Sequence, residues 1–232
     1  MGPVTELRQL SDLDEQALRA HYAPVRVPWF RLNFVATTDG AAQGPDGLSG
    51  SINNAADQRV FNALRGLADV IIVGAGTARA EGYRPNPKPM VVVSRSGEVP
   101  HSLRERRGGE LLMATCGRAP HLEETRAQLG GEHVLILGEY TPDLVTMRRE
   151  LVARGFRDLL CEGGPHLSRD LLAAGVVDEL CLTTVPRLIG AHHLRVTAGP
   201  PVDVGLRLHA LLEDDGTLLA RWTLEGYLDH LG

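Results

Sequence analysis

Residues 69–80 read DVIIVGAGTARA, and this stretch decides the fold class. A short, continuous apolar run bounded by glycine is typical of a strand that is buried on both faces of its sheet. Glycines that follow such a strand and lead toward a helix allow a tight turn. The stretch therefore predicts a strand, a turn and a helix in immediate succession.

Similar apolar runs recur along the chain, and helical patterns separate several of them. Further strands are expected at 30–38, 89–94, 110–115, 133–138 and 158–164. Helices are expected from Asn54 onward and at 119–129, 142–154 and 165–174. This alternation predicts an α/β fold with a mostly parallel central sheet flanked by helices. The last third reads as strands at 178–190 and 217–228 with no helix between them, which predicts antiparallel C-terminal strands.

The N-terminal segment reads as a separate lead-in with one short helix. Ser11 and Asp14 resemble a capping box ahead of an amphipathic stretch, and Pro24 and Pro28 end that stretch. No internal repeat or low-complexity tract follows it. We therefore expect a lead-in over 1–28 and a single domain over 29–232.

Composition excludes several classes of function. The chain has 232 residues with 43% hydrophobic and 23% charged residues and a formal net charge of −5, which is typical of a soluble globular protein and offers no broad basic surface for nucleic acid. Its three cysteines form no CxxC pair and the doublet His192-His193 lacks a third ligand, so we expect no metal site and a reducing, cytoplasmic location. No 18-residue apolar run exists, so we expect neither a membrane span nor a signal peptide.

Glycines follow the strand at 69–74 in a way that suits an anionic ligand. Gly74, Gly76 and Thr77 form a turn between a buried strand and a helix, where backbone N–H groups can bind phosphate. The dinucleotide fingerprint is incomplete because Arg79 stands at its third glycine position. Taken alone, the turn is either an ordinary connection or a cofactor loop.

The next strand ends in Ser94 and Arg95, about where nucleotide-binding sheets select the ribose. An acidic residue there would bind a free 2′-hydroxyl group, whereas a hydroxyl and a guanidinium suit a 2′-phosphate. A solvated turn is the simpler alternative. Together with the preceding glycine turn, the pair favours NADP over NAD.

The stretch LLCEGGPHL, residues 159–167, supplies a third turn of this kind. Gly163 and Gly164 permit close approach to a pyrophosphate, and Pro165 suits the first position of a helix. Because ligands of open α/β sheets bind at the carboxyl ends of the strands, the three turns together predict a clamp around one dinucleotide.

A fourth candidate is the loop after the strand at 30–38. Asp39 lies just past the strand end, and the hydroxyls of Ser49 and Ser51 follow it, which is compatible with a substrate loop. The dipeptide Asp39-Gly40 is equally typical of a plain turn. No GxSxG, Walker A or HExxH pattern is present, which argues against hydrolases and kinases.

Several stretches together resemble the reductase domain of the deaminase/reductase family of riboflavin biosynthesis, whose fold is similar to dihydrofolate reductase. They are RLNFVATTDG, SGSINN, LRGLADVIIVGAGTARAEGY, VVVSRSG, LLCEGGPHL and AAGVVDELCLTTVPRLIG, which span about residues 30–190 in the family's order. The chain looks most like the stand-alone pyrimidine reductase-like proteins of actinobacteria. The deaminase signatures HxE and PCxxC are absent, which leaves reduction alone.

The resemblance implies NADPH-dependent reduction of a 5-amino-6-(5-phosphoribosylamino)uracil-type compound, with hydride transfer to C1′ of the ring-opened ribosylamine, by a homodimer. It assigns the cofactor to Ser51, Gly74, Gly76, Thr77, Glu81, Ser94, Arg95, Gly163, Gly164, Pro165, His166, Leu167 and Ser168. It assigns the substrate to Asn33, Ser49, Arg65 and Glu162. Glu162 and Asp39 are the acids that we expect in catalysis.

Asn33 is the departure with the largest consequence, because members of the family often carry a lysine at this position, facing the substrate. Two alternatives therefore stay open: reduction of a dihydrofolate-like or pterin ring, and a non-catalytic sensor that binds NADPH. A third, a Rossmann-type sugar dehydrogenase, would prefer NAD, against which Ser94 and Arg95 argue.

Overall fold

The computed structural model describes residues 7–104 and 108–224. Its strands are β1 (Arg8–Gln9), β2 (Trp29–Thr37), β3 (Val70–Gly74), β4 (Met90–Val93), β5 (Leu111–Thr115), β6 (Val134–Ile136), β7 (Asp158–Cys161), β8 (Glu179–Val185), β9 (Leu206–Asp214) and β10 (Thr217–Leu224). Its α-helices are α1 (Glu15–His21), α2 (Ala55–Leu67), α3 (Ala75–Ala80), α4 (Leu122–Leu129), α5 (Leu144–Ala153) and α6 (Pro165–Ala173).

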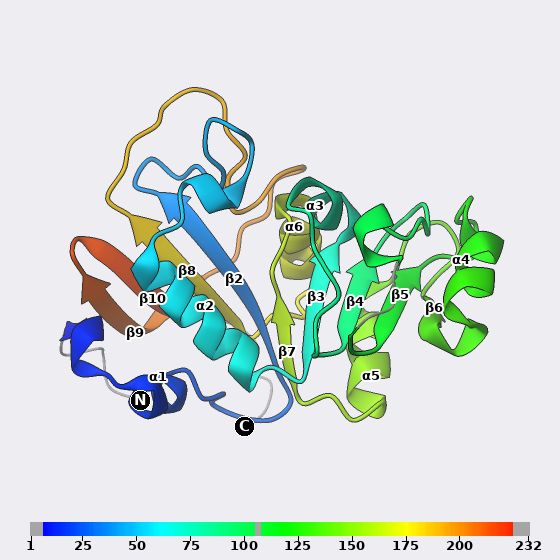
Figure 1. Cartoon of the computed structure of the whole chain (residues 1–232), viewed down its shortest axis with the longest axis horizontal. Helices are drawn as coiled ribbons and strands as arrows, with labels where there is room; N and C mark the ends of the chain where they lie inside the picture. The colour runs from blue at the N-terminus through cyan, green and yellow to red at the C-terminus, as the bar shows by residue number, and fades with distance from the viewer. Residues whose placement is uncertain (1–6, 105–107, 225–232) are drawn as a thin grey trace.

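The described strands form one sheet in the order β1-β9-β10-β8-β2-β7-β3-β4-β5-β6 (Figure 1). From β8 to β6 all neighbouring strands are parallel. The strand β10 is antiparallel to both β8 and β9, while β1 joins the outer edge of β9 in parallel. The predicted α/β class, mostly parallel sheet and antiparallel C-terminal strands are confirmed.

The differences from the expected elements have local causes. The run at 158–164 ends as a strand at Cys161 because Glu162 to Gly164 form the turn before α6. The run at 133–138 keeps only three strand residues. The strand β9 was not expected, because its residues are half-exposed and mix charged with apolar side chains. Residues 225–228 of the predicted last strand lie outside the described residues.

Helices cover both faces of the sheet. On one face, Met147 and Leu151 of α5 and Leu171 of α6 pack on Phe30 and Ile72 of the strands. On the other face, α2 packs on the sheet through residues that include Val60 and Leu64, beside Leu160 and Cys181. Neighbouring residues of β7, Leu159 and Leu160, thus face opposite layers, as the two-residue period of a strand requires. In Figure 1, α2 runs alongside β2 on the viewer's side of the sheet.

The N-terminal helix exists, but its cap differs from the expected one. Asp14 rather than Ser11 precedes the first turn, and its carboxylate accepts the N–H of Ala17 at 2.7 Å. Leu10, Leu18 and Tyr22 are buried against α2 and the C-terminal strands. The boundary at residue 28 stays a prediction, and the described part of the lead-in shares the core of the sheet.

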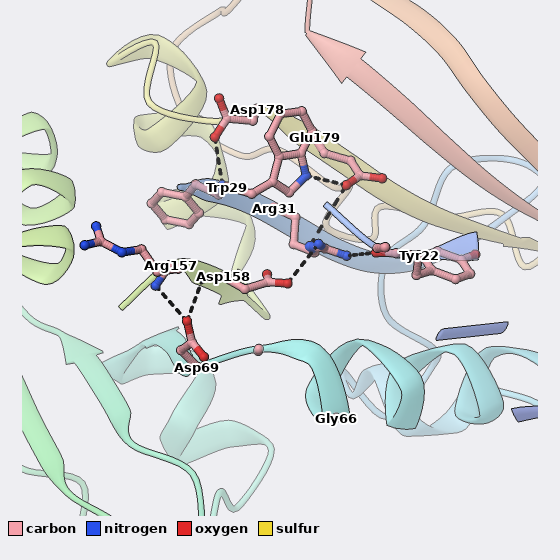
Figure 2. A network of polar contacts seen from close by, with 12 residues as sticks. Tyr22, Trp29, Arg31, Gly66, Asp69, Arg157, Asp158, Asp178 and Glu179 are labelled. Carbon is pink, nitrogen blue, oxygen red and sulfur yellow. Dashed lines mark hydrogen bonds and ion pairs between the residues drawn. The ribbon is translucent and has the colours of Figure 1, made fainter. Parts of the chain in front are cut away.

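The amino ends of β2, β7 and β8 are joined by buried charges. Figure 2 shows Arg31 of β2 between Asp158 and Glu179, which begin β7 and β8. Arg31 Nη2 donates to Asp158 Oδ2 at 3.1 Å, and its Nε lies 4.0 Å from Glu179 Oε2. Glu179 also accepts Trp29 Nε1 at 2.6 Å and Arg221 Nε at 2.5 Å. This group, the amino-end network, fixes how the central strands start.

Candidate active site

A cavity of about 690 Å³ opens at the opposite edge, where the parallel strands β2, β3 and β7 end and α3 and α6 begin. Figure 1 shows these strands pointing toward the same edge. The wall is completed by α2 and by the loop that follows β2. Most of the predicted site residues line it: Asn33, Ser49, Arg65, Gly74, Gly76, Thr77, Glu81, Glu162, Gly164, Pro165, His166 and Leu167.

The two glycine turns meet in the cavity wall. Gly74 N–H donates to the carbonyl oxygen of Gly163 at 2.7 Å, so the end of β3 is tied to the turn after β7. A Cβ atom on Gly164 would overlap the hydroxyl of Thr77. Gly163 has a φ of +94°, and a Cβ there would lie 3.0 Å from the ring of Phe34. Glycine is therefore required at both positions by the protein itself.

Both helices that start at these turns lack a side-chain cap. Gly74 precedes α3 and Gly164 precedes α6, with Pro165 at the first position of α6. The first N–H groups of a helix have no partner within it and carry partial positive charge. A Cβ on Gly76 would meet nothing within 4 Å, so the backbone there is open to the cavity. These residues fit the pyrophosphate of a dinucleotide.

Both carboxylate oxygens of Glu162 accept hydrogen bonds from two neighbouring side chains. Its Oε1 accepts Arg65 Nε at 2.6 Å, and its Oε2 accepts Arg65 Nη2 and the Tyr83 hydroxyl, each at 2.7 Å. The side chain of Glu162 is only 3% exposed, while that of Arg65 is 28% exposed. The guanidinium of Arg65 also stacks on the ring of Phe61, 4.3 Å from its centroid. Such a bidentate pair fixes the plane of Arg65 and leaves its Nη1 outside both bonds.

The electrostatics of this group keep its protons in place. Burial and the charge of Glu162 raise the pKa of Tyr83 well above its ordinary value, so its hydroxyl stays protonated and donates. Burial would lower the pKa of Arg65, but the hydrogen bond and charge of Glu162 outweigh this and raise it. Arg65 therefore presents a permanent cation to the cavity.

Glu81 and Ser49 both line the cavity, and they contact each other. The Glu81 carboxylate accepts the N–H of Ser49 at 2.8 Å. This bond ties the loop after β2 to the end of α3, and both residues line the cavity.

The other predicted residues are not in the cavity wall. Asp39 accepts the Thr37 hydroxyl at 2.5 Å and the N–H of Gly190 at 2.7 Å, and these bonds lower its pKa. It thereby joins the turn after β2 to the loop after β8. Ser51 donates to Asp46 at 2.7 Å.

Four more predicted residues outside the lining follow β4 and β7 in the chain, and one of them, Ser168, lies within α6. Ser94 is buried, and its Oγ accepts the N–H of Gly97 at 3.1 Å, so it stabilises its own turn. Arg95 is exposed to solvent. Ser168 and the neighbouring Gly163 are buried beneath the first turn of α6.

Sequence reasoning missed several residues of the wall, notably Asp57 and Tyr83. Asp57, Phe61 and Arg65 are spaced four residues apart on α2 and therefore lie on one face of that helix. That spacing was available in the sequence once Arg65 had been singled out. Tyr83 follows α3 in irregular chain, where no periodic signal exists.

The described residues offer neither a candidate metal site nor a helix that could span a membrane. In the described ranges, no group of three or more His, Cys, Asp or Glu side chains could hold a metal ion. No α-helix within 7–104 and 108–224 combines the length and the apolar character that crossing a bilayer requires.

Comparison with known proteins identifies the family of the chain. A family model described as the RibD C-terminal domain matches residues 28–219. The 2,5-diamino-6-ribosylamino-4(3H)-pyrimidinone 5′-phosphate reductase of Archaeoglobus fulgidus is 28% identical over 181 residues, which cover 70% of this chain and 82% of the relative. The riboflavin biosynthesis protein RibD of Corynebacterium ammoniagenes is 30% identical over 166 residues, 72% of this chain but 45% of that protein.

A solved structure supports the fold. The crystal structure of a pyrimidine reductase-like protein from Corynebacterium diphtheriae superimposes with a TM-score of 0.79 at 23% identity, over 91% of this chain and 99% of that one. The match of the family model runs from β2 to the start of β10, so it covers every described strand except β1 and the rest of β10. The chain belongs to the RibD C-terminal domain family, whose curated relatives include pyrimidinone phosphate reductases.

Proposed function

We propose that this protein is an NADPH-dependent reductase that converts a phosphoribosylamino-pyrimidine of riboflavin biosynthesis into its ribitylamino form. The proposal rests on the hydrogen bond from Gly74 to Gly163, which joins the turns before α3 and α6. The start of α6 and the Arg65–Glu162–Tyr83 group line the same cavity. One cavity thus combines an anion-binding turn with a fixed cation. The curated relatives support the reaction class.

The cofactor, when bound, supplies a hydride from C4 of its nicotinamide ring. Within the chain, the first turn of α6 and the backbone at Gly76 bind its pyrophosphate. Arg95, exposed two residues after β4, would bind the 2′-phosphate of the cofactor. This last contact is the part of the proposal that selects NADPH over NADH.

The substrate is held by the walls that α2 and the loop after β2 provide. Arg65 binds the sugar phosphate through Nη1, while Glu162 and Tyr83 hold the guanidinium in one plane. Arg84, exposed on the cavity rim, adds a second cation. The acceleration comes from fixing the electrophilic carbon at the hydride donor, which is mainly positioning.

The proposal also includes the oligomeric state of the protein and its location in the cell. We infer a homodimer that pairs through the C-terminal strands, because β9 is half-exposed and Leu206 and Leu218 are 39% and 40% exposed there. Mass measurement by light scattering tests the dimer. The three buried free cysteines suit a reducing compartment, which favours the cytoplasm.

Steady-state oxidation of NADPH tests the activity. We expect turnover with 5-amino-6-(5-phosphoribosylamino)uracil or its 2-amino counterpart and none with dihydrofolate. Turnover with dihydrofolate alone would favour a pterin reductase. Tight NADPH binding without turnover of any of these compounds would favour a sensor.

The variant Glu162→Gln tests whether this carboxylate contributes to turnover. An uncharged amide loses the charge-assisted pair with Arg65, so turnover should fall roughly 100-fold while NADPH affinity stays within about twofold. Glu123→Gln, at an exposed carboxylate of α4, is the matched control. Unchanged turnover in Glu162→Gln would remove this carboxylate from the mechanism.

A further inference from the structure

The loop after β8 covers residues 186–205 without a helix or a strand. Connections of this length are uncommon inside a compact domain, and they often serve a function. On one side of the cavity, the N–H of Ala42 donates to the carbonyl oxygen of Leu194 at 2.7 Å. On the other side, the N–H of Ala198 donates to the carbonyl oxygen of Pro165 at 3.2 Å. These bonds fix the loop between the loop after β2 and the start of α6.

Leu194 of this loop is an exposed apolar side chain in the cavity wall. It is 40% exposed, whereas Phe34 and Leu167 of the same wall are 8% and 9% exposed because they pack in the core. The bond from Ala42 fixes the carbonyl group of Leu194, and Val196, two residues later, packs against the core. The side chain of Leu194 therefore has apolar surface available for a ligand in the cavity.

The order of the strands indicates which end of the dinucleotide comes to this loop. With the 2′-phosphate at Arg95 after β4 and the pyrophosphate at the turns after β3 and β7, the cofactor crosses the carboxyl ends of three neighbouring strands. The next strand is β2, which lies three strand spacings from β4, or about 14 Å at about 4.8 Å each. Because β2 and β8 are parallel neighbours, the nicotinamide end then meets the loops that follow them.

The chemistry of leucine narrows the choice of ligand group further. The side chain of Leu194 offers no hydrogen bond, so a phosphate or a sugar hydroxyl placed against it would lose water without gaining a partner. The flat face of a ring suits it, and both the nicotinamide and the pyrimidine have such a face. The bond from the same loop to Pro165, at the start of the pyrophosphate-binding helix, favours the nicotinamide.

We propose that Leu194 forms the apolar wall against which one face of the nicotinamide ring of NADPH packs. The covered face is then closed to water and to substrate, so the hydride leaves from the opposite face. Leu194 itself forms no bond in the reaction, and it acts by fixing the plane of the ring. The inference rests on the proposed function, because it names a cofactor contact of that same site.

The test compares two nucleotides that differ only in the ring, NADPH and 2′-phospho-ADP-ribose, which keeps the 2′-phosphate and the pyrophosphate. Calorimetry measures the affinity of each. Leu194→Ala should weaken NADPH binding roughly tenfold, because most of the apolar contact is lost, and should leave 2′-phospho-ADP-ribose within about twofold of the wild type. Leu194 is exposed, so the variant is expected to fold.

Two further variants separate the contact from a general effect on the loop. Leu194→Met keeps an apolar side chain of similar size and should bind NADPH within about twofold of the wild type. Leu188→Ala removes a leucine of the same loop that is 76% exposed and outside the cavity lining, and it should change neither affinity.

A loss in Leu194→Ala that is confined to NADPH supports the proposal. An unchanged NADPH affinity, or an equal loss for both nucleotides, overturns it, and weakened binding of the pyrimidine substrate alone would assign Leu194 to that ring instead. If the wild type binds neither nucleotide, the proposed cofactor fails together with this contact. If the loss is confined to NADPH but no phosphoribosylamino-pyrimidine is reduced, the proposed reaction fails while the contact of Leu194 stands.

Discussion

The two ends of the central strands use charged residues in opposite ways. At the amino ends, Glu179 is completely buried, and Trp29, Arg31 and Arg221 surround its carboxylate. At the carboxyl ends, Asp57 is almost as buried, yet one of its oxygens has no partner. At the amino end the Glu179 carboxylate is filled, although Asp158 Oδ1 and Arg31 Nε lack a hydrogen-bond partner. At the carboxyl end, the residue with the unpaired acceptor lines a cavity together with Arg65.

The pKa directions follow this difference. Burial would raise the pKa of Glu179, but the charge and hydrogen bond of Arg221 outweigh it and lower the pKa. Burial raises the pKa of Asp57, and a single hydroxyl does not reverse that. A buried charge with partners contributes to holding the strands together, and a buried group without them is a candidate for binding.

The largest expected effect is at the amino ends of the strands. Glu179→Ala leaves Arg31 and Arg221 buried without their shared carboxylate, so the free energy of unfolding should fall by about 3–5 kcal/mol. Guanidinium denaturation measures it, with Glu150→Ala on the exposed side of α5 as the control. A loss below about 1 kcal/mol would show that the network does not stabilise the fold.

A pH titration tests the same network through Asp158. Burial, assisted by the charges of Asp69 and Glu179, raises its pKa from 3.8 to about 6 despite the opposing charge of Arg31. The folded state therefore holds this proton more tightly than the unfolded chain does. The associated stability is present below about pH 4 and is lost as the pH rises through 6.

The expected size follows from the shift, at up to about 3 kcal/mol between pH 4 and pH 6. Asp158→Asn should abolish this fall, so the difference in unfolding free energy between variant and wild type should change with pH. His21, whose pKa burial and Arg221 lower to about 4, titrates in both proteins and cancels in the difference. A difference that does not vary with pH would contradict the assignment.

At the carboxyl end, Gly164→Ala tests the junction of the two turns. The new Cβ overlaps the Thr77 hydroxyl and displaces the first turn of α3 from that of α6. NADPH affinity should fall by roughly 10- to 100-fold, because pyrophosphate binding needs both turns in register. Fluorescence titration measures it, with Gly131→Ala, where a Cβ meets nothing within 4 Å, as the control.

A double variant isolates the cause of that loss. Removing the hydroxyl in Gly164→Ala/Thr77→Ala takes away the overlap, so the two substitutions should be strongly non-additive. Additive losses would mean that the glycine is required for another reason.

The smallest expected effect is at Arg95, which lies outside the cavity wall. Arg95→Ala should reduce the preference for NADPH over NADH by roughly tenfold, since an exposed guanidinium binds phosphate weakly in salt. Arg118→Ala, also exposed, should leave the preference unchanged. Equal preference in Arg95→Ala and wild type would remove the 2′-phosphate contact from the proposal.

The fold was predictable where local signals were strong. The apolar runs that became β3, β4 and β5 are buried on both faces and bounded by turns, so their pattern in the sequence is unambiguous. The strand β9 was not predicted because it is half-exposed and its alternation is broken by charged residues. The position of β1 beside β9 depends on contacts between the chain ends, which no local pattern encodes.

The residues of the site were likewise predictable only where a local pattern in the sequence marked them. Gly74 and Gly164 were found because glycine at a strand end has a local geometric meaning. The bonds of Asp39 could not be foreseen, since they depend on a loop about 150 residues away in the sequence. Asp57 was missed because an aspartate near a helix start is ordinary in sequence, and only its burial and missing partner distinguish it.

In the proposed reaction, a sugar carbon bound in the carboxyl-end cavity receives a hydride from the nicotinamide cofactor. The most direct test supplies NADPH deuterated at the transferred position of nicotinamide C4, together with each phosphoribosylamino-pyrimidine, and locates the label in the product by NMR. We expect one deuterium on C1′ of the ribityl chain and none on the ring. Deuterium on the pyrimidine ring, or consumption of substrate without transfer of label, would contradict it.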